Sequence, residues 1–167
     1  MKKIIIAIDS FKGCLTSAEA GKAAEKGIKS INPSCHTSVI PIADGGEGLL
    51  DVLIRATKGK YITLSAHGPL MKMAKTHYGL SGNGRTAIIE MAAISGLPLV
   101  PIEQRNPMLT TTFGTGELIK DALNKGCRNF IIGIGGSATN DAGLGMLQAL
   151  GFRFLDKSGH TLGTGGQ

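Results

Sequence analysis

The sequence predicts an α/β fold, and three observations carry that prediction. Apolar runs alternate with segments of helical period, a polar loop with glycine follows each of the first runs, and the 25 glycines among 167 residues gather at the ends of these segments. Such alternation is typical of parallel strands joined by right-handed crossovers. An apolar fraction of 42% and a charged fraction of 18% indicate a globular chain that can bury a core.

Residues 4–8 are predicted to form the first strand. A continuous β-branched run is typical of a strand that is buried on both faces of a parallel sheet. The polar loop 9–13 leaves the carboxyl end of this strand. Thr16 and Glu19 have the spacing of a capping box, so we expect a helix over residues 17–30.

The same order of elements then occurs again. A second strand is expected over residues 38–42, followed by the polar loop 43–48 and a helix over residues 49–56. The carboxyl ends of parallel strands share one edge of a sheet, where ligands bind in α/β proteins. Loops 9–13 and 43–48 are therefore predicted to lie together at a ligand site.

The pattern changes at Gly68, after a third strand over residues 61–65, and we expect a domain boundary there. Residues 1–67 would belong to one domain and residues 68–167 to part of a second. The second part is expected to begin with an antiparallel hairpin, because Asn-Gly is a strong turn signal. The hairpin strands are expected over residues 71–80 and 85–91. Later helices are expected over residues 91–95, 117–125 and 141–150, and later strands over residues 130–134 and 152–155.

The junction at residues 133–143 follows a strand and opens a helix, as in sites that hold an anion. Its glycines allow backbone N–H groups to approach a ligand, and the helix adds the positive end of its dipole. The alternative is a close-packed turn in which Asp141 caps the helix. The candidate binding residues here are Gly135, Gly136, Ser137, Thr139 and Asn140, while Asp141 could bind a cation or accept a proton.

Polar residues in the other loops extend this candidate site. Asp44 and Glu47 follow a strand, where carboxylates could bind Mg²⁺ or activate a hydroxyl, although Asp and Gly also serve in ordinary turns. Lys12 could neutralise a phosphate or a carboxylate. A Thr- and Gly-rich loop over residues 110–116 could form an anion nest. The further candidate binding residues are Asp9, Ser10, Gly45, Gly46, Glu47 and Thr115.

Composition argues against several other classes of protein. The net charge of +6 comes from dispersed basic residues, and with no Trp and no nucleic-acid-binding motif we expect no nucleic-acid partner. No apolar run approaches the length of a membrane span. The 3 cysteines are far apart, which favours a reducing compartment and predicts a cytoplasmic protein. The GxxxxGK[ST] pattern is absent, and a dinucleotide fingerprint is matched only loosely at residues 133–138.

Several segments, read together, resemble the type 1 glycerate kinases of bacteria, the glycerate 2-kinase family. The resemblance covers the chain from its start to its end and corresponds to the N-terminal part of the family sequence. The segments that carry it are Asp9-Ser10-Phe11-Lys12-Gly13, Ala43-Asp44-Gly45-Gly46-Glu47-Gly48, Ile89-Glu90-Met91-Ala92, Thr111-Thr112-Phe113-Gly114-Thr115-Gly116-Glu117 and Gly135-Gly136-Ser137-Ala138-Thr139-Asn140-Asp141.

This resemblance implies ATP- and Mg²⁺-dependent phosphorylation of D-glycerate to 2-phosphoglycerate, with 3-phosphoglycerate as the other possible product. It also implies a flavodoxin-like parallel-sheet domain and a second α/β domain that resembles restriction enzymes, with the active site between them. For phosphoryl transfer we expect Lys12, Asp44 and Asp141 to be catalytic, with Mg²⁺ held by Asp44 or Asp141. The expected partners are small molecules, and the oligomeric state is left open.

Members of the resembled family are longer than this chain, and the glycine-rich residues 161–167 have no element after them. We therefore expect the native chain to continue. A fragment that binds ligands without catalysis stays open as an alternative function. A nicotinamide-dependent oxidoreductase on the same scaffold is the second alternative.

Overall fold

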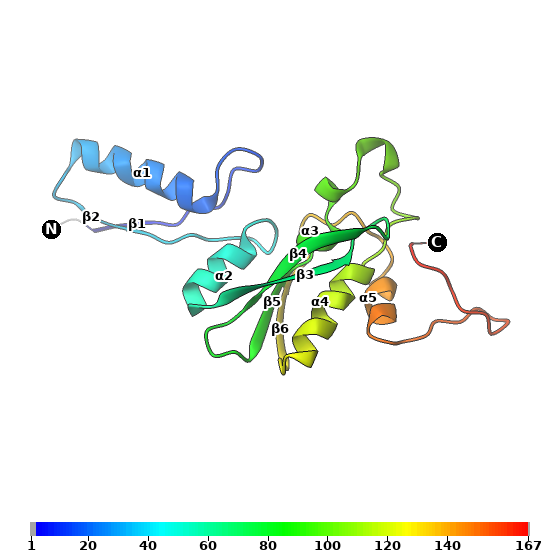
Figure 1. Cartoon of the computed structure of the whole chain (residues 1–167). Helices are drawn as coiled ribbons and strands as arrows, with labels where there is room; N and C mark the ends of the chain where they lie inside the picture. The colour runs from blue at the N-terminus through cyan, green and yellow to red at the C-terminus, as the bar shows by residue number, and fades with distance from the viewer. Residues whose placement is uncertain (1–2, 167) are drawn as a thin grey trace.

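The computed structural model describes residues 3–166 and confirms an α/β fold. Strands β1 (Lys3–Ile6) and β2 (His36–Val39) form a two-stranded sheet, and the second sheet has the order β3-β4-β5-β6. Figure 1 shows the first sheet and α1 lying to one side of the larger sheet. The other elements are α1 (Ser17–Ile31), α2 (Leu49–Thr57), β3 (Lys60–His67), β4 (Met73–Leu80), β5 (Thr86–Glu90), α3 (Ala92–Ser95), α4 (Phe113–Asn124), β6 (Asn129–Gly133) and α5 (Leu144–Ala149), with 3-10 turns η1 (Leu97–Leu99) and η2 (Ile102–Gln104).

The N-terminal part begins as the sequence predicts, with a capped helix between two parallel strands. The Glu19 amide donates to the Thr16 hydroxyl at 3.2 Å, and the Thr16 amide donates to the Glu19 carboxylate at 2.8 Å. Each end of α1 lacks intrahelical partners for its backbone groups, and this capping box supplies them at the first turn. The sequence prediction of the helix start is confirmed.

The prediction that the first strand is buried on both faces was wrong for this chain. Ile4 is 36% exposed and Ile5 is 60% exposed, and only Ile6 of this strand is buried. Among residues 3–166, β1 has one neighbouring strand, β2, and α1 packs on the pair. A β-branched run predicts the strand, but its burial depends on which elements cover it.

The larger sheet takes in the third predicted strand. β3 pairs antiparallel with β4 along its whole length, from Lys60 opposite Leu80 to His67 opposite Met73. The chain therefore leaves the first sheet at Val39 and enters the second at Lys60. The domain boundary expected near Gly68 stays a prediction. The pairing of β3 with β4 depends on long-range contacts, which local sequence does not specify.

The predicted hairpin of β4 and β5 is confirmed, with Gly84 in the turn at a φ of +69°. β5 then pairs in parallel with β6, which places Glu90 opposite Gly133. Both residues are the last of their strands. The parallel pair thus ends where the glycine-rich junction begins.

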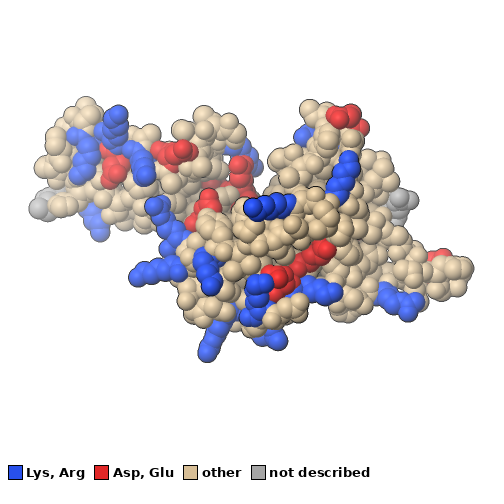
Figure 2. Space-filling view, in the orientation of Figure 1, with Lys and Arg blue, Asp and Glu red and all other residues tan. Residues whose placement is uncertain are grey.

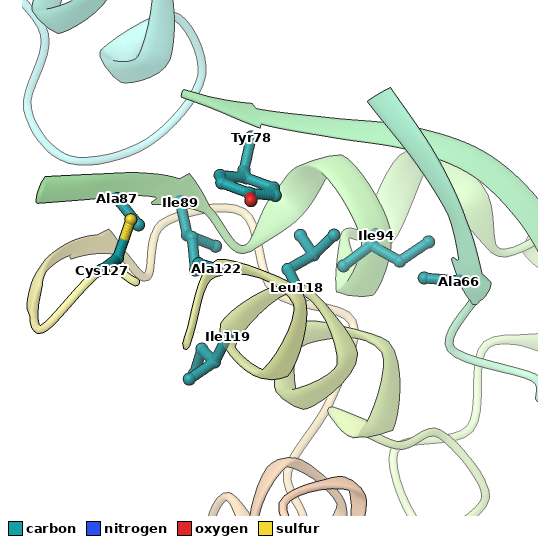
Figure 3. Packing of buried hydrophobic residues seen from close by; sticks show 9 residues of the cluster. All are labelled: Ala66, Tyr78, Ala87, Ile89, Ile94, Leu118, Ile119, Ala122 and Cys127. Carbon is teal, nitrogen blue, oxygen red and sulfur yellow. The ribbon is translucent and has the colours of Figure 1, made fainter. Parts of the chain in front are cut away.

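The core lies on both faces of β5, in two separate clusters. Ile88 packs with Leu50 and Ile54 of α2, whereas Ala87 and Ile89 belong to the larger cluster on the face covered by α4. Successive strand residues point to opposite faces, so this alternation follows from the strand geometry. Figure 3 shows the larger cluster, which consists of Ala66, Tyr78, Ala87, Ile89, Ile94, Leu118, Ile119, Ala122 and Cys127.

Several predicted elements differ from the structure. The first two strands, expected over residues 4–8 and 38–42, lie at Lys3–Ile6 and His36–Val39. α4 begins at Phe113 instead of residue 117, and a Cβ at Gly116 would lie 2.2 Å from the Met146 carbonyl oxygen. The glycine there serves close packing of α4 on α5. α5 begins at Leu144 instead of residue 141, and the strand predicted over residues 152–155 was wrong, because only an isolated bridge from Leu155 is present. No helix among residues 3–166 has the length and apolar character needed to cross a membrane.

Candidate active-site cleft

A cleft of about 480 Å³ opens between the N-terminal part and the larger sheet. Figure 2 shows acidic side chains facing this hollow, with Lys and Arg side chains spread over the rest of the visible face. Of the sequence-predicted site residues, Ser10, Lys12 and Glu47 line the cleft. The other ionisable or aromatic side chains on its walls are those of Phe11, Cys14, Glu19, Asp51, Arg55, His77 and Glu90.

The loops after β1 and β2 lie together, as predicted, and one hydroxyl joins them. The Ser17 hydroxyl donates to the Ile8 carbonyl at 2.7 Å and accepts from the Ile42 amide at 3.0 Å. Asp9 accepts from the Ser10 amide at 2.7 Å, which holds the first residues of the loop in a turn. This arrangement leaves the Lys12 side chain on the cleft wall.

The second loop is in direct backbone contact with the glycine-rich junction. The Gly135 amide donates to the Gly45 carbonyl at 3.1 Å, and Asp44 accepts from the Gly46 amide at 3.0 Å. A Cβ at Gly135 would lie 2.6 Å from Gly46 Cα, and one at Gly133 would lie 2.5 Å from the Gly45 carbonyl oxygen. Glycine is therefore required at both positions for the two chain segments to approach this closely.

The next residues of the junction run away from this contact and pair with other loops. The Leu97 amide donates to the Gly136 carbonyl at 2.9 Å, and the Ala138 amide donates to the Ser95 carbonyl at 2.9 Å. The Ser137 and Thr139 hydroxyls lie 2.8 Å apart and bond each other. Neither these two side chains nor the exposed Asn140 is among the residues that line the cleft.

Asp141 lies in the interior between the start of α4 and the start of α5, at only 3% exposure. Its carboxylate accepts from the amides of Thr112, Gly143 and Gly145 at 2.8, 3.1 and 3.2 Å, and from the hydroxyls of Thr111 and Thr112. A buried carboxylate is stable when its lone pairs are occupied in this way. This geometry favours the capping role that the sequence left open, extended to a second helix.

Thr115 is likewise buried, at 1% exposure, and its hydroxyl lies 2.8 Å from that of Ser95. It sits on the first turn of α4, facing the core. The expected anion nest at residues 110–116 is half helix, and two of its backbone N–H groups already have partners. The Gly116 amide donates to the Thr112 carbonyl at 3.3 Å, and the Phe113 amide donates to the Thr111 hydroxyl at 3.2 Å.

Glu90 is the site residue that sequence reasoning did not select. It ends β5, lines the cleft, and accepts from the Leu50 amide at 3.2 Å. Burial raises the pKa of the Glu90 carboxyl above its ordinary value, and the carboxylates of Asp51 and Glu47 raise it further, while the Leu50 and Gly48 amides oppose the shift. The position of Glu90 at the carboxyl end of a parallel strand is the sequence feature that could have identified it as a site residue.

The remaining wall carries the imidazole of His77 and the guanidinium of Arg55, and Tyr61, which does not line the cleft, contacts two of its lining residues. The Tyr61 hydroxyl donates to Asp51, and this bond raises the pKa of Tyr61 to about 12. The Tyr61 and His77 rings meet edge to face with centroids 5.5 Å apart. Arg55, in the last turn of α2, adds a second cation to the cleft beside Lys12.

No group of three or more His, Cys, Asp or Glu side chains among residues 3–166 forms a ready-made metal site. Mg²⁺ does not require such a group of three protein ligands, because one or two carboxylates together with substrate phosphates suffice to hold it. Asp44 is exposed and uses one carboxylate oxygen for the Gly46 amide, so it suits such a shared site. Asp141 does not, because backbone and hydroxyl donors surround it.

Glycine-rich loops at the strand ends of an α/β fold, beside a cleft, are the setting in which many α/β proteins bind small ligands. The sequence model of the glycerate kinase family matches residues 4–167. The chain belongs to the glycerate kinase family.

Individual relatives agree with this assignment. The chain is 56% identical to a glycerate kinase of Bacillus subtilis and 51% identical to a glycerate 2-kinase of Escherichia coli, covering 98% of this chain and 43% of each relative. A crystal structure of a Salmonella typhimurium LT2 protein described as a glycerate kinase 2 superposes with a TM-score of 0.83 at 49% identity, over 98% of this chain and 44% of that one. The chain therefore spans less than half the length of these relatives.

The surroundings of Asp141 predict that Asp141→Asn destabilises the fold. An amide NH₂ would face N–H and O–H donors, and leaving such buried groups unpaired costs about 1–3 kcal/mol. Urea unfolding of the protein as encoded measures this loss. Asp156→Asn is the control, because Asp156 also accepts backbone amides but is exposed. An unchanged midpoint for Asp141→Asn would contradict the structural role.

The environment of Glu90 predicts a pH-dependent stability. Because its pKa is raised in the folded state, its contribution is fully present below the ordinary glutamate pKa and is lost as the pH rises through the raised value. Glu90→Gln has no such loss and keeps an acceptor for the Leu50 amide. The free energy of unfolding of Glu90→Gln minus that of the unchanged protein should therefore increase from pH 4 to pH 7. A constant or shrinking difference in urea titrations would contradict the burial of this charge.

Proposed function

We propose that the protein containing this chain transfers the γ-phosphoryl group of ATP to a hydroxyl of D-glycerate. Membership of the glycerate kinase family supports the reaction, and the observation that carries it in this chain is the composition of the cleft. Lys12 and Arg55 face a space that is also lined by Glu47, Asp51 and Glu90. Cations and carboxylates in one enclosed space are what phosphoryl transfer to an anionic acceptor requires.

The cations serve to bind substrate charge. Lys12 is placed to neutralise a phosphate or the glycerate carboxylate, and Arg55 can bind a carboxylate in the two-pronged manner of a guanidinium. The backbone of Gly45 and Gly46, held by Gly135, forms the neighbouring wall where a phosphate chain can approach without side chains in its way. Asp9 and Ser10 complete the loop that carries Lys12.

Mg²⁺ would be held by Asp44 together with the phosphates of ATP. When bound, this ion supplies positive charge to the transferring phosphoryl group. We assign Asp141 to the support of this region through its bonds to Thr112 and Gly145, and not to the metal. Ser137, Thr139 and Asn140 are kept as candidates for binding the phosphates of ATP or the carboxylate of the substrate, because they follow Gly136 on the same chain segment.

The proposed product is 2-phosphoglycerate, and the alternative product is 3-phosphoglycerate. Two small molecules, D-glycerate and ATP, are the proposed partners, and the cytoplasm is the proposed location, where both occur as soluble metabolites. A division of the protein into an N-terminal domain ending near Gly68 and a second domain is kept as part of the proposal.

The test is a coupled assay of ADP release from the protein as encoded, with ATP, Mg²⁺ and D-glycerate. Turnover that requires all three is expected, and ³¹P NMR of the product distinguishes the 2-phosphate from the 3-phosphate. Omission of D-glycerate is the control for ATPase activity. Thermal stabilisation by ATP without turnover would favour a non-catalytic binding protein, and stabilisation by NADH alone would favour an oxidoreductase; either result contradicts the proposal.

A further inference from the structure

The Glu90 carboxylate is partly buried and has no cationic partner among the residues that the structure describes, which is unusual for an acidic side chain. It is half-buried at the end of β5, and no ion pair among residues 3–166 includes it. Its hydrogen bonds come from backbone amides, those of Leu50 and Gly48, and no side-chain donor in the described chain bonds it. A partly desolvated charge without a cationic partner lowers stability, and such groups concentrate at functional sites.

The position of Glu90 follows from three elements. Pairing of β5 with β6 sets it opposite Gly133, where the glycine-rich junction begins. Alternation along β5 directs it to the face of Ile88, on which α2 packs. The Leu50 amide at the start of α2 then holds one carboxylate oxygen, Oε2, at 3.2 Å. The side chain is thereby fixed on the cleft wall, between the loop that carries Asp44 and the space that Lys12 faces.

The geometry points to Glu90 as the catalytic base of the reaction, the group that accepts the proton of the attacking glycerate hydroxyl. This inference rests on the proposed function. The hydroxyl oxygen forms a bond to the γ-phosphorus of ATP, and its proton passes to the Glu90 carboxylate. The bond from the γ-phosphorus to the β–γ bridging oxygen breaks, and ADP leaves with that electron pair. The proton is afterwards released from Glu90 to solvent.

The other carboxylates of the cleft are less suited to this step. Asp51 is exposed and accepts the Tyr61 hydroxyl, and Glu47 is exposed on its loop. Both of these side chains are open to solvent, whereas Glu90 is half-buried on the cleft wall and is held by the Leu50 amide. Burial raises the pKa of the Glu90 carboxyl, which suits a group that accepts a proton. Of the charged groups, Asp51 and Glu47 raise the pKa of Glu90. The charged or titratable side chains on the same cleft walls are those of Lys12, Cys14, Glu19, Glu47, Asp51, Arg55 and His77.

The test measures kcat and KM against pH for the protein as encoded and for Glu90→Gln. Gln keeps an acceptor for the Leu50 amide and removes the base, so kcat should fall by about 10²–10⁴-fold, the usual contribution of a general base. KM for ATP should change little. For the unchanged protein, kcat should decline toward low pH along a limb that Glu90→Gln lacks. Glu103→Gln, an exposed acid on η2 outside the cleft, is the control expected to keep full activity.

Three other outcomes would contradict the role of Glu90 as the base. A Glu90→Gln kcat close to that of the unchanged protein, with Glu90→Ala impaired, would reduce Glu90 to a cap of α2. If Glu90→Gln does not fold, a kcat of the unchanged protein that stays flat between about pH 4.5 and 8 overturns the inference by itself. If the unchanged protein phosphorylates no glycerate, the proposed function is wrong, and the role of Glu90 in it is wrong as well. If the unchanged protein is active and Glu90→Gln is equally active, only the role of Glu90 is wrong.

Discussion

The structure depends on one close approach, that of the backbone at Gly133–Gly135 to the backbone at Gly45 and Gly46. The Gly135 amide donates to the Gly45 carbonyl, and no side chain fits between the two segments. This contact joins the end of β6 to the loop that starts α2, although the two are far apart in sequence. It thereby fixes the cleft wall on which Glu47, Asp51 and Glu90 lie.

Two buried or half-buried carboxylates, those of Asp141 and Glu90, have different surroundings. Asp141 has five protein donors from two elements and holds the starts of α4 and α5 together. Glu90 accepts from the backbone amides of Leu50 and Gly48, has no side-chain donor among residues 3–166, and faces the cleft. Full satisfaction stabilises a buried charge, whereas partial satisfaction leaves a group able to exchange a proton. The two environments separate a structural role from a chemical one.

Local features could be predicted from the sequence, and long-range ones could not. The capping box at Thr16 and the turn at Gly84 depend on residues within a few positions of each other, and both were predicted correctly. The pairing of β3 with β4 instead of the first sheet depends on distant contacts. The cleft position of Glu90 requires β5, β6 and α2 together. Three of the five donors to Asp141 belong to Thr111 and Thr112, so neither environment follows from local sequence alone.

The most direct test of the close approach is the Gly135→Ala variant of the protein as encoded. Its Cβ would lie 2.6 Å from Gly46 Cα, so the two segments must separate. We expect a loss of about 1–3 kcal/mol in unfolding free energy, as for overpacking, and a fall in kcat/KM for glycerate of about 100-fold from displaced site groups. Gly27→Ala, where a Cβ meets no atom within 4 Å, should leave kcat/KM unchanged. Full kcat/KM in Gly135→Ala would contradict the dependence of the site on this contact.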